Sequence, residues 1–98
     1  MNYKEIETSK GVLKYRMPNI LEAYDLLDTS GIQLGVSTLK LKRNIIDSMG
    51  PMIDYSGIEG VDSYQNLLTM VDDMVMPLGA IADEIIMKTF DAFKKKNT

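Results

Sequence analysis

Hydrophobic and polar residues alternate near the N-terminus of the chain. The alternation over residues 3–17 predicts a β-hairpin, and Gly11 supplies the positive φ that a short hairpin loop often needs. In the second arm Leu13 and Tyr15 share one face, while Lys14 lies on the other. This pattern predicts a hairpin with one side covered and one side in water.

Helical spacing replaces the alternation after residue 18. We expect a helix over residues 20–29, with Asn19 as its N-cap and Glu22 as the capping-box partner three residues on. One side of this helix is apolar, and we expect that side to face the core. Its residues are Ile20, Leu21, Ala23, Tyr24 and Leu27.

Residues 38–49 fit two patterns. The leucines and lysines at the start alternate as in a strand, whereas Leu41, Ile45 and Met49 repeat as in a helix. The length of the segment favours the helix, and Gly50-Pro51 ends it in either case.

Residues 50–62 form the longest predicted loop, because three glycines and a proline interrupt any regular period. The loop is nevertheless apolar at Met52, Ile53, Tyr55, Ile58 and Val61. We favour a loop fixed onto the core, and a binding edge is the alternative.

The last third of the chain predicts a helical pair over residues 63–76 and 77–96, separated at Pro77 and capped by Asp62 or Ser63. The sequence as a whole therefore predicts one domain, 1–98. Its expected fold class is α+β and mostly helical, with an N-terminal β-hairpin followed by three to four helices.

Composition narrows the possible functions. The chain has 98 residues, no His and no Cys, so the commonest general base, the commonest metal ligand and any thiol nucleophile are missing. No Gly is followed by Lys-Ser or Lys-Thr, and the acidic loop from Asp54 to Asp62 lacks the ligand spacing of a calcium site. We expect no enzyme activity, no catalytic residues, no metal and no cofactor.

Charge and hydropathy argue against two further classes of partner. Residues 1–50 carry seven Lys or Arg against six Asp or Glu, whereas residues 51–98 carry four Lys or Arg against eight Asp or Glu. The acidic second half disfavours nucleic acid binding, which needs a clustered cationic surface. No apolar run is long enough for a membrane span. We therefore expect no nucleic acid partner and no membrane partner.

Methionine is abundant, with eight residues in the chain, four of them between residues 70 and 87. Methionine adapts to irregular surfaces, so these residues either fill the core or face a partner. A partner would be a second copy of the chain, giving a homo-oligomer, or an apolar helix of another protein lying in a groove.

The order of the elements resembles the small tail assembly chaperones of long-tailed bacteriophages. The resemblance covers most of the chain: a hairpin, a central helix, a Gly-rich loop and a C-terminal helical pair that ends in lysines. Its most characteristic stretch is Arg16-Met17-Pro18-Asn19-Ile20-Leu21-Glu22-Ala23.

The resemblance implies a function. Such chaperones coat the apolar helical tape-measure protein before the tail tube polymerises, can recruit tube subunits, act in the host cytoplasm of the bacterial cell, and leave before the virion is mature. We call the methionine-rich apolar side of the last two predicted helices, which includes Met70 and Met74, the methionine stripe. To this side we assign client contact, through Met70, Val71, Met74, Leu78 and Phe90. The alternatives are a structural virion component, such as a tail-completion or neck subunit, and a small protein-binding adaptor.

Overall fold

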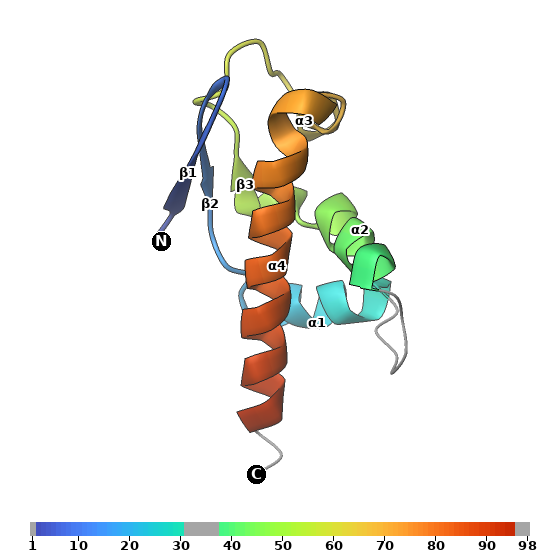
Figure 1. The fold of residues 1–98 in the computed structure, drawn as a ribbon. Helices are drawn as coiled ribbons and strands as arrows, with labels where there is room; N and C mark the ends of the chain where they lie inside the picture. Colours follow the sequence, from blue (N-terminus) through green and yellow to red (C-terminus); the bar gives the residue numbers. More distant parts are fainter. Residues whose placement is uncertain (1, 31–37, 96–98) are drawn as a thin grey trace.

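The computed structural model describes residues 2–30 and 38–95 of the chain. Within these residues a small antiparallel sheet packs with helices around one long C-terminal helix (Figure 1). The predicted fold class, α+β and mostly helical, is confirmed. The elements are β1 Lys4–Thr8, β2 Gly11–Tyr15, α1 Ile20–Ser30, α2 Thr38–Ser48, the 3₁₀ helix η1 Gly50–Met52, β3 Ile53–Asp54, α3 Tyr64–Leu68 and α4 Val71–Lys95.

The predicted hairpin is confirmed in β1 and β2. The two strands pair antiparallel, from Lys4 opposite Tyr15 to Thr8 opposite Gly11. Gly11 has φ +132°, and a Cβ at this position would lie 2.1 Å from the carbonyl oxygen of Gly57. Glycine is therefore required both by the backbone angle and by the closeness of the neighbouring chain.

The apolar loop over residues 50–62 is fixed onto the core, as favoured from the sequence. Met52, Ile53 and Ile58 are buried. Ile53 and Asp54 also form the short strand β3, which pairs antiparallel with β2 and makes the hairpin a three-stranded sheet. The sequence pattern did not predict this strand, because two residues are too few to show a period.

The first C-terminal helix begins where the sequence predicted. The Ser63 hydroxyl caps α3 by accepting a hydrogen bond from the backbone N–H of Asn66 at 3.0 Å. The helix ends earlier than predicted, because the N–H groups of Thr69 and Met70 bond three residues back, to Asn66 and Leu67, which tightens the last turn. The break in the predicted pair therefore falls at residues 69–70.

Pro77 does not separate two helices, so the predicted boundary between residues 76 and 77 is wrong. It lies inside the continuous helix α4. A proline inside a helix removes one backbone hydrogen bond and costs about 3 kcal/mol. The buried face of α4 continues on both sides of Pro77, from Met74 to Ile85, and its burial offsets that cost.

Helix α4 is the centre of the fold. The hairpin packs against it on one side and α2 on another, while α1 packs against α2, and the last turns of α4 extend beyond the other elements (Figure 1). Polar contacts fix the hairpin to α4, because Glu84 accepts a hydrogen bond from the Tyr15 hydroxyl at 3.0 Å and pairs with Lys4. The core consists of Leu13, Tyr15, Leu26, Leu41, Ile45, Met49, Met52, Ile53, Ile58, Leu67, Met74, Leu78, Ile81, Ala82 and Ile85.

A candidate docking surface on helix α1

The five residues assigned to client contact do not form one surface. Met74 and Leu78 are 1% and 4% exposed and belong to the core, so their assignment is corrected: a partner could reach them only if the core opened. Met70 is partly buried against the same core, and Val71 is exposed at the start of α4. The side chain of Phe90 lies outside the described residues.

Exposed apolar side chains lie together on one side of α1. Ile20 and Leu21 are 76% and 75% exposed, and Tyr24 is 50% exposed. Among the side chains of α1 that the structure describes, residues 20–26, Leu26 is the buried apolar one, and it lies on the opposite side. The prediction that the Ile20 side of α1 faces the core is therefore wrong, because the helix turns that side outward.

An ion pair with Glu22 explains this orientation. Arg16, just after β2, donates from Nη1 to Glu22 Oε1 at 2.6 Å and from Nη2 to Oε2 at 2.8 Å. The same guanidinium donates to the Pro51 carbonyl at 3.2 Å, and the Arg16 backbone N–H donates to the Met52 carbonyl at 3.0 Å. Arg16 thus holds the Glu22 side of α1 against η1, which leaves the Ile20 side in solvent.

The predicted capping box completes this network. The Asn19 N–H donates to Glu22 Oε1 at 3.0 Å, and the Glu22 N–H donates to Asn19 Oδ1 at 2.9 Å. The pKa of Glu22 is lowered to about 2, mainly by the Arg16 guanidinium and to a smaller extent by the Asn19 N–H, against the opposing effect of burial. Glu22 therefore stays ionised, and α1 begins from a fixed direction.

An apolar groove adjoins the outward face of α1. It has a volume of about 220 Å³ and lies between the β2–α1 connection, α1 and the C-terminal half of α4. Lys88 is the charged side chain in its lining, which is otherwise mostly apolar. The lining residues are Met17, Pro18, Asn19, Ile20, Ala23, Lys88 and Thr89.

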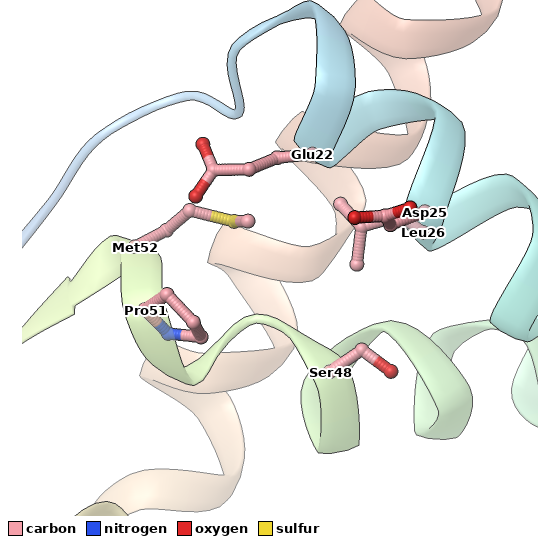
Figure 2. Close-up of a pocket in the computed structure, with 6 residues that line it drawn as sticks. All are labelled: Glu22, Asp25, Leu26, Ser48, Pro51 and Met52. Carbon is pink, nitrogen blue, oxygen red and sulfur yellow. The ribbon is translucent and has the colours of Figure 1, made fainter.

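A second pocket lies on the other side of α1, where this helix meets the end of α2 and η1 (Figure 2). Its volume is about 170 Å³. In Figure 2, Glu22, Asp25 and Leu26 come from α1, and Ser48, Pro51 and Met52 come from the segment that faces it. Helix α1 therefore forms a ridge with a groove on each side.

The stretch over residues 16–23 has two roles in the structure. Arg16, Asn19 and Glu22 hold the start of α1 through the ion pair and the capping box. The apolar groove is lined by the remaining side chains Met17, Pro18, Ile20 and Ala23. Sequence reasoning found the stretch and its cap, but it did not find the groove, because the groove depends on how α1 is rotated.

A second set of exposed apolar side chains lies along α4. Val71, Val75, Met76 and Met87 are exposed on this helix. At 1.5 Å per residue, Val71 lies about 27 Å along the helix axis from the groove residue Thr89. Val71 and the α1 groove therefore cannot contact one short partner segment together.

The titratable groups with shifted pKa values have structural roles. Burial raises the pKa of Tyr64, with a smaller contribution from Asp47, and the Tyr64 hydroxyl donates to the Ile46 carbonyl. Among residues 2–30 and 38–95, no three His, Cys, Asp or Glu side chains gather in a way that would hold a metal ion. None of the helices in this part of the chain combines the length and the apolar character that a bilayer crossing needs.

Comparison with protein-family models, with curated proteins and with solved structures gives no match to this chain.

Proposed function

We propose that this chain is a non-enzymatic client-binding protein that covers an apolar helix with the outward face of α1 and the adjoining groove. The observation that carries the proposal is the exposure of Ile20, Leu21 and Tyr24 beside an apolar groove, in a domain whose core is already filled by other residues. A contiguous exposed apolar surface of this kind marks an interaction site in a folded domain.

The size of the surface favours weak and reversible binding. Burying one large apolar side chain completely contributes about 1.5–3 kcal/mol. Three such side chains, exposed by half to three quarters, would contribute roughly 3–6 kcal/mol together. Association costs about 4–15 kcal/mol, so one site alone binds a client loosely. A chaperone that must later leave its client needs this property.

The specific client we propose is a phage tape-measure protein, which fits the resemblance of residues 16–23 to tail assembly chaperones. A long apolar helical client offers many similar but unequal segments. Loose contacts through Ile20, Leu21 and the flexible Met17 accommodate such variation better than a rigid pocket does. In this proposal the chain acts in the bacterial host cytoplasm, assists assembly of the tail tube and is absent from the mature virion.

Co-expression with the tape-measure protein encoded by the same genome tests the proposal, followed by pull-down and by titration of purified client segments. Leu21→Glu places a charge at the centre of the α1 surface. Leu39→Glu is the matched control, because Leu39 is 77% exposed on α2 and does not line the groove. We expect Leu21→Glu to weaken client binding at least about tenfold, a change of 1.4 kcal/mol, and Leu39→Glu to leave it unchanged.

Both substitutions are at exposed positions, so both variants should unfold at the wild-type temperature. Equal loss of binding in the two variants would refute the α1 surface as the client site. Absence of any complex between the wild-type chain and the tape-measure protein would refute the chaperone function, and recovery of the chain from purified virions would favour a structural role.

A further inference from the structure

We propose that, without a client, the outward face of α1 binds the same face of a second copy of the chain in a two-fold dimer. The dimer would cover the apolar surface until a client displaces it, and this displacement step rests on the proposed function.

Three zones follow one another across this face. Lys88 lies at one edge, in the wall of the apolar groove. Ile20, Leu21 and Tyr24 form the exposed ridge. Asp25 lies at the other edge, in the lining of the second pocket. The surface therefore runs from a cation through an apolar ridge to a carboxylate, and both charged side chains are exposed.

A two-fold axis that runs parallel to the ridge, in the plane of the contact, makes this surface complementary to itself. In such a contact residue i meets residue j of the second copy, and residue j meets residue i. The apolar ridges meet at the centre, and Lys88 of each copy faces Asp25 of the other. An arrangement with the same order of zones but like charges at both edges would instead repel its own copy.

A two-fold dimer needs a continuous surface of sufficient area on each copy. Specific interfaces cover about a tenth of a small protein's surface on each partner. The accessible surface of this chain is 6586 Å², so a dimer at the lower end of the size range needs roughly 600 Å² from each copy. The exposed side of α1 and the wall of the groove form one continuous area, because Ile20 belongs to both. We expect a weak dimer, with a dissociation constant between about 1 μM and about 1 mM.

Sedimentation equilibrium of the full chain from about 1 μM to about 1 mM tests the dimer. Asp25→Lys and Lys88→Glu each place like charges together twice in a two-fold contact, so each variant alone should dimerise about tenfold more weakly. The double variant should dimerise like the wild type. A mixture of the two single variants should also form heterodimers, because every pair is then of opposite charge.

Two results would overturn the dimer: a chain that stays monomeric over the whole range, or single variants that dimerise as well as the wild type. Failure of the double variant to recover dimerisation would overturn the proposed pairing of Lys88 with Asp25. Circular dichroism of each variant reports whether the fold is kept, and the charge recovery in the double variant cannot come from unfolding.

Titration of a client segment into the wild-type dimer tests the displacement. We expect the dimer fraction to fall as client binds, and Leu21→Glu to weaken both dimer and client complex. Client binding to a strictly monomeric chain would leave the proposed function intact and overturn the dimer. A dimer with the expected charge dependence and no affinity for client would support the dimer and overturn the proposed function. A ternary complex of dimer and client would overturn the displacement of one by the other.

Discussion

The ion pair between Arg16 and Glu22 makes stability depend on pH in a defined window. The pKa of Glu22 is about 2 in the folded chain against an ordinary value of 4.5. Each pKa unit corresponds to 1.36 kcal/mol, so the full shift would correspond to about 3 kcal/mol. The Glu22 side chain is 21% exposed, and solvent screens part of this interaction, so we expect about 1–2 kcal/mol.

The direction in which stability changes with pH follows from the direction of the pKa shift of Glu22. The folded chain lowers the pKa of Glu22, so the unfolded chain takes up this proton first as the pH falls. The stabilisation is complete above pH 4.5 and is lost as the pH falls from there towards 2. Above pH 5 the contribution is constant.

Glu22→Gln isolates this contribution, because glutamine can still serve in the capping box but cannot pair with Arg16 as an ion. The free energy of unfolding, measured by urea titration, should be about 1–2 kcal/mol lower in the variant at pH 7. The difference between wild type and variant should shrink to near zero at pH 2. The difference in free energy of unfolding between wild type and variant cancels the pH dependence that comes from other carboxylates, such as Glu84.

Arg16→Gln serves as the second arm of a double-mutant cycle. If the ion pair carries the effect, Arg16→Gln and Glu22→Gln together should cost less than the sum of the two single changes. A difference between wild type and Glu22→Gln that stays the same from pH 2 to pH 7 would refute the reasoning, because the stabilisation would then not depend on the charge of Glu22.

Four further substitutions test the packing, one of them as a control. Met74→Ala should lower the free energy of unfolding by about 2–4 kcal/mol in denaturant titrations. Met76→Ala, on the exposed side of α4, is the control and should change this free energy by less than about 0.5 kcal/mol. Equal effects of the two substitutions would contradict the assignment of Met74 to the core. Gly11→Ala should destabilise by at least about 1–3 kcal/mol, because φ is +132° and the new methyl group meets the Gly57 carbonyl, and an unchanged melting temperature would contradict this. Pro77→Ala should raise the melting temperature, because alanine restores a helix hydrogen bond and removes the clash of the proline ring, which together are worth up to about 3 kcal/mol. A lower melting temperature would show that Pro77 has a packing role.

The features predicted correctly from the sequence are local ones. The capping box of Asn19 and Glu22 and the Ser63 cap involve residues three positions apart, so their spacing alone identifies them. The hairpin required only a period of two and a glycine at position 11. These interactions form within a few residues, and distant parts of the chain do not change them.

The orientation of α1 could not be predicted in this way. Its sequence shows which side is apolar, and the usual expectation is that this side is buried. In the structure Arg16 binds Glu22 and also the carbonyl groups of η1, so a contact with a segment 35 residues later in the chain decides which side faces the core. Arg16, three residues before the cap, was the available signal, but its second partner was not visible in the sequence.

For the methionine stripe the error is the opposite one: residues that the sequence assigned to a partner surface are buried in the core. Met74 and Leu78 have the composition of an adaptable binding surface, yet α4 is the central helix of the fold and needs them as core. A helix that contacts both a sheet and another helix must bury a wide face. Composition alone does not reveal how many neighbours a helix has, and this number separates a core stripe from a partner stripe.

The most direct test of the central claim, that the outward face of α1 is where a partner binds, is an NMR titration of ¹⁵N-labelled chain with a helical segment of the tape-measure protein. We predict the largest amide shifts in residues 17–25 and around Lys88, with small shifts in α3 and at the start of α4. Shifts concentrated at Val71, Val75 and Met76, with α1 unaffected, would contradict the claim.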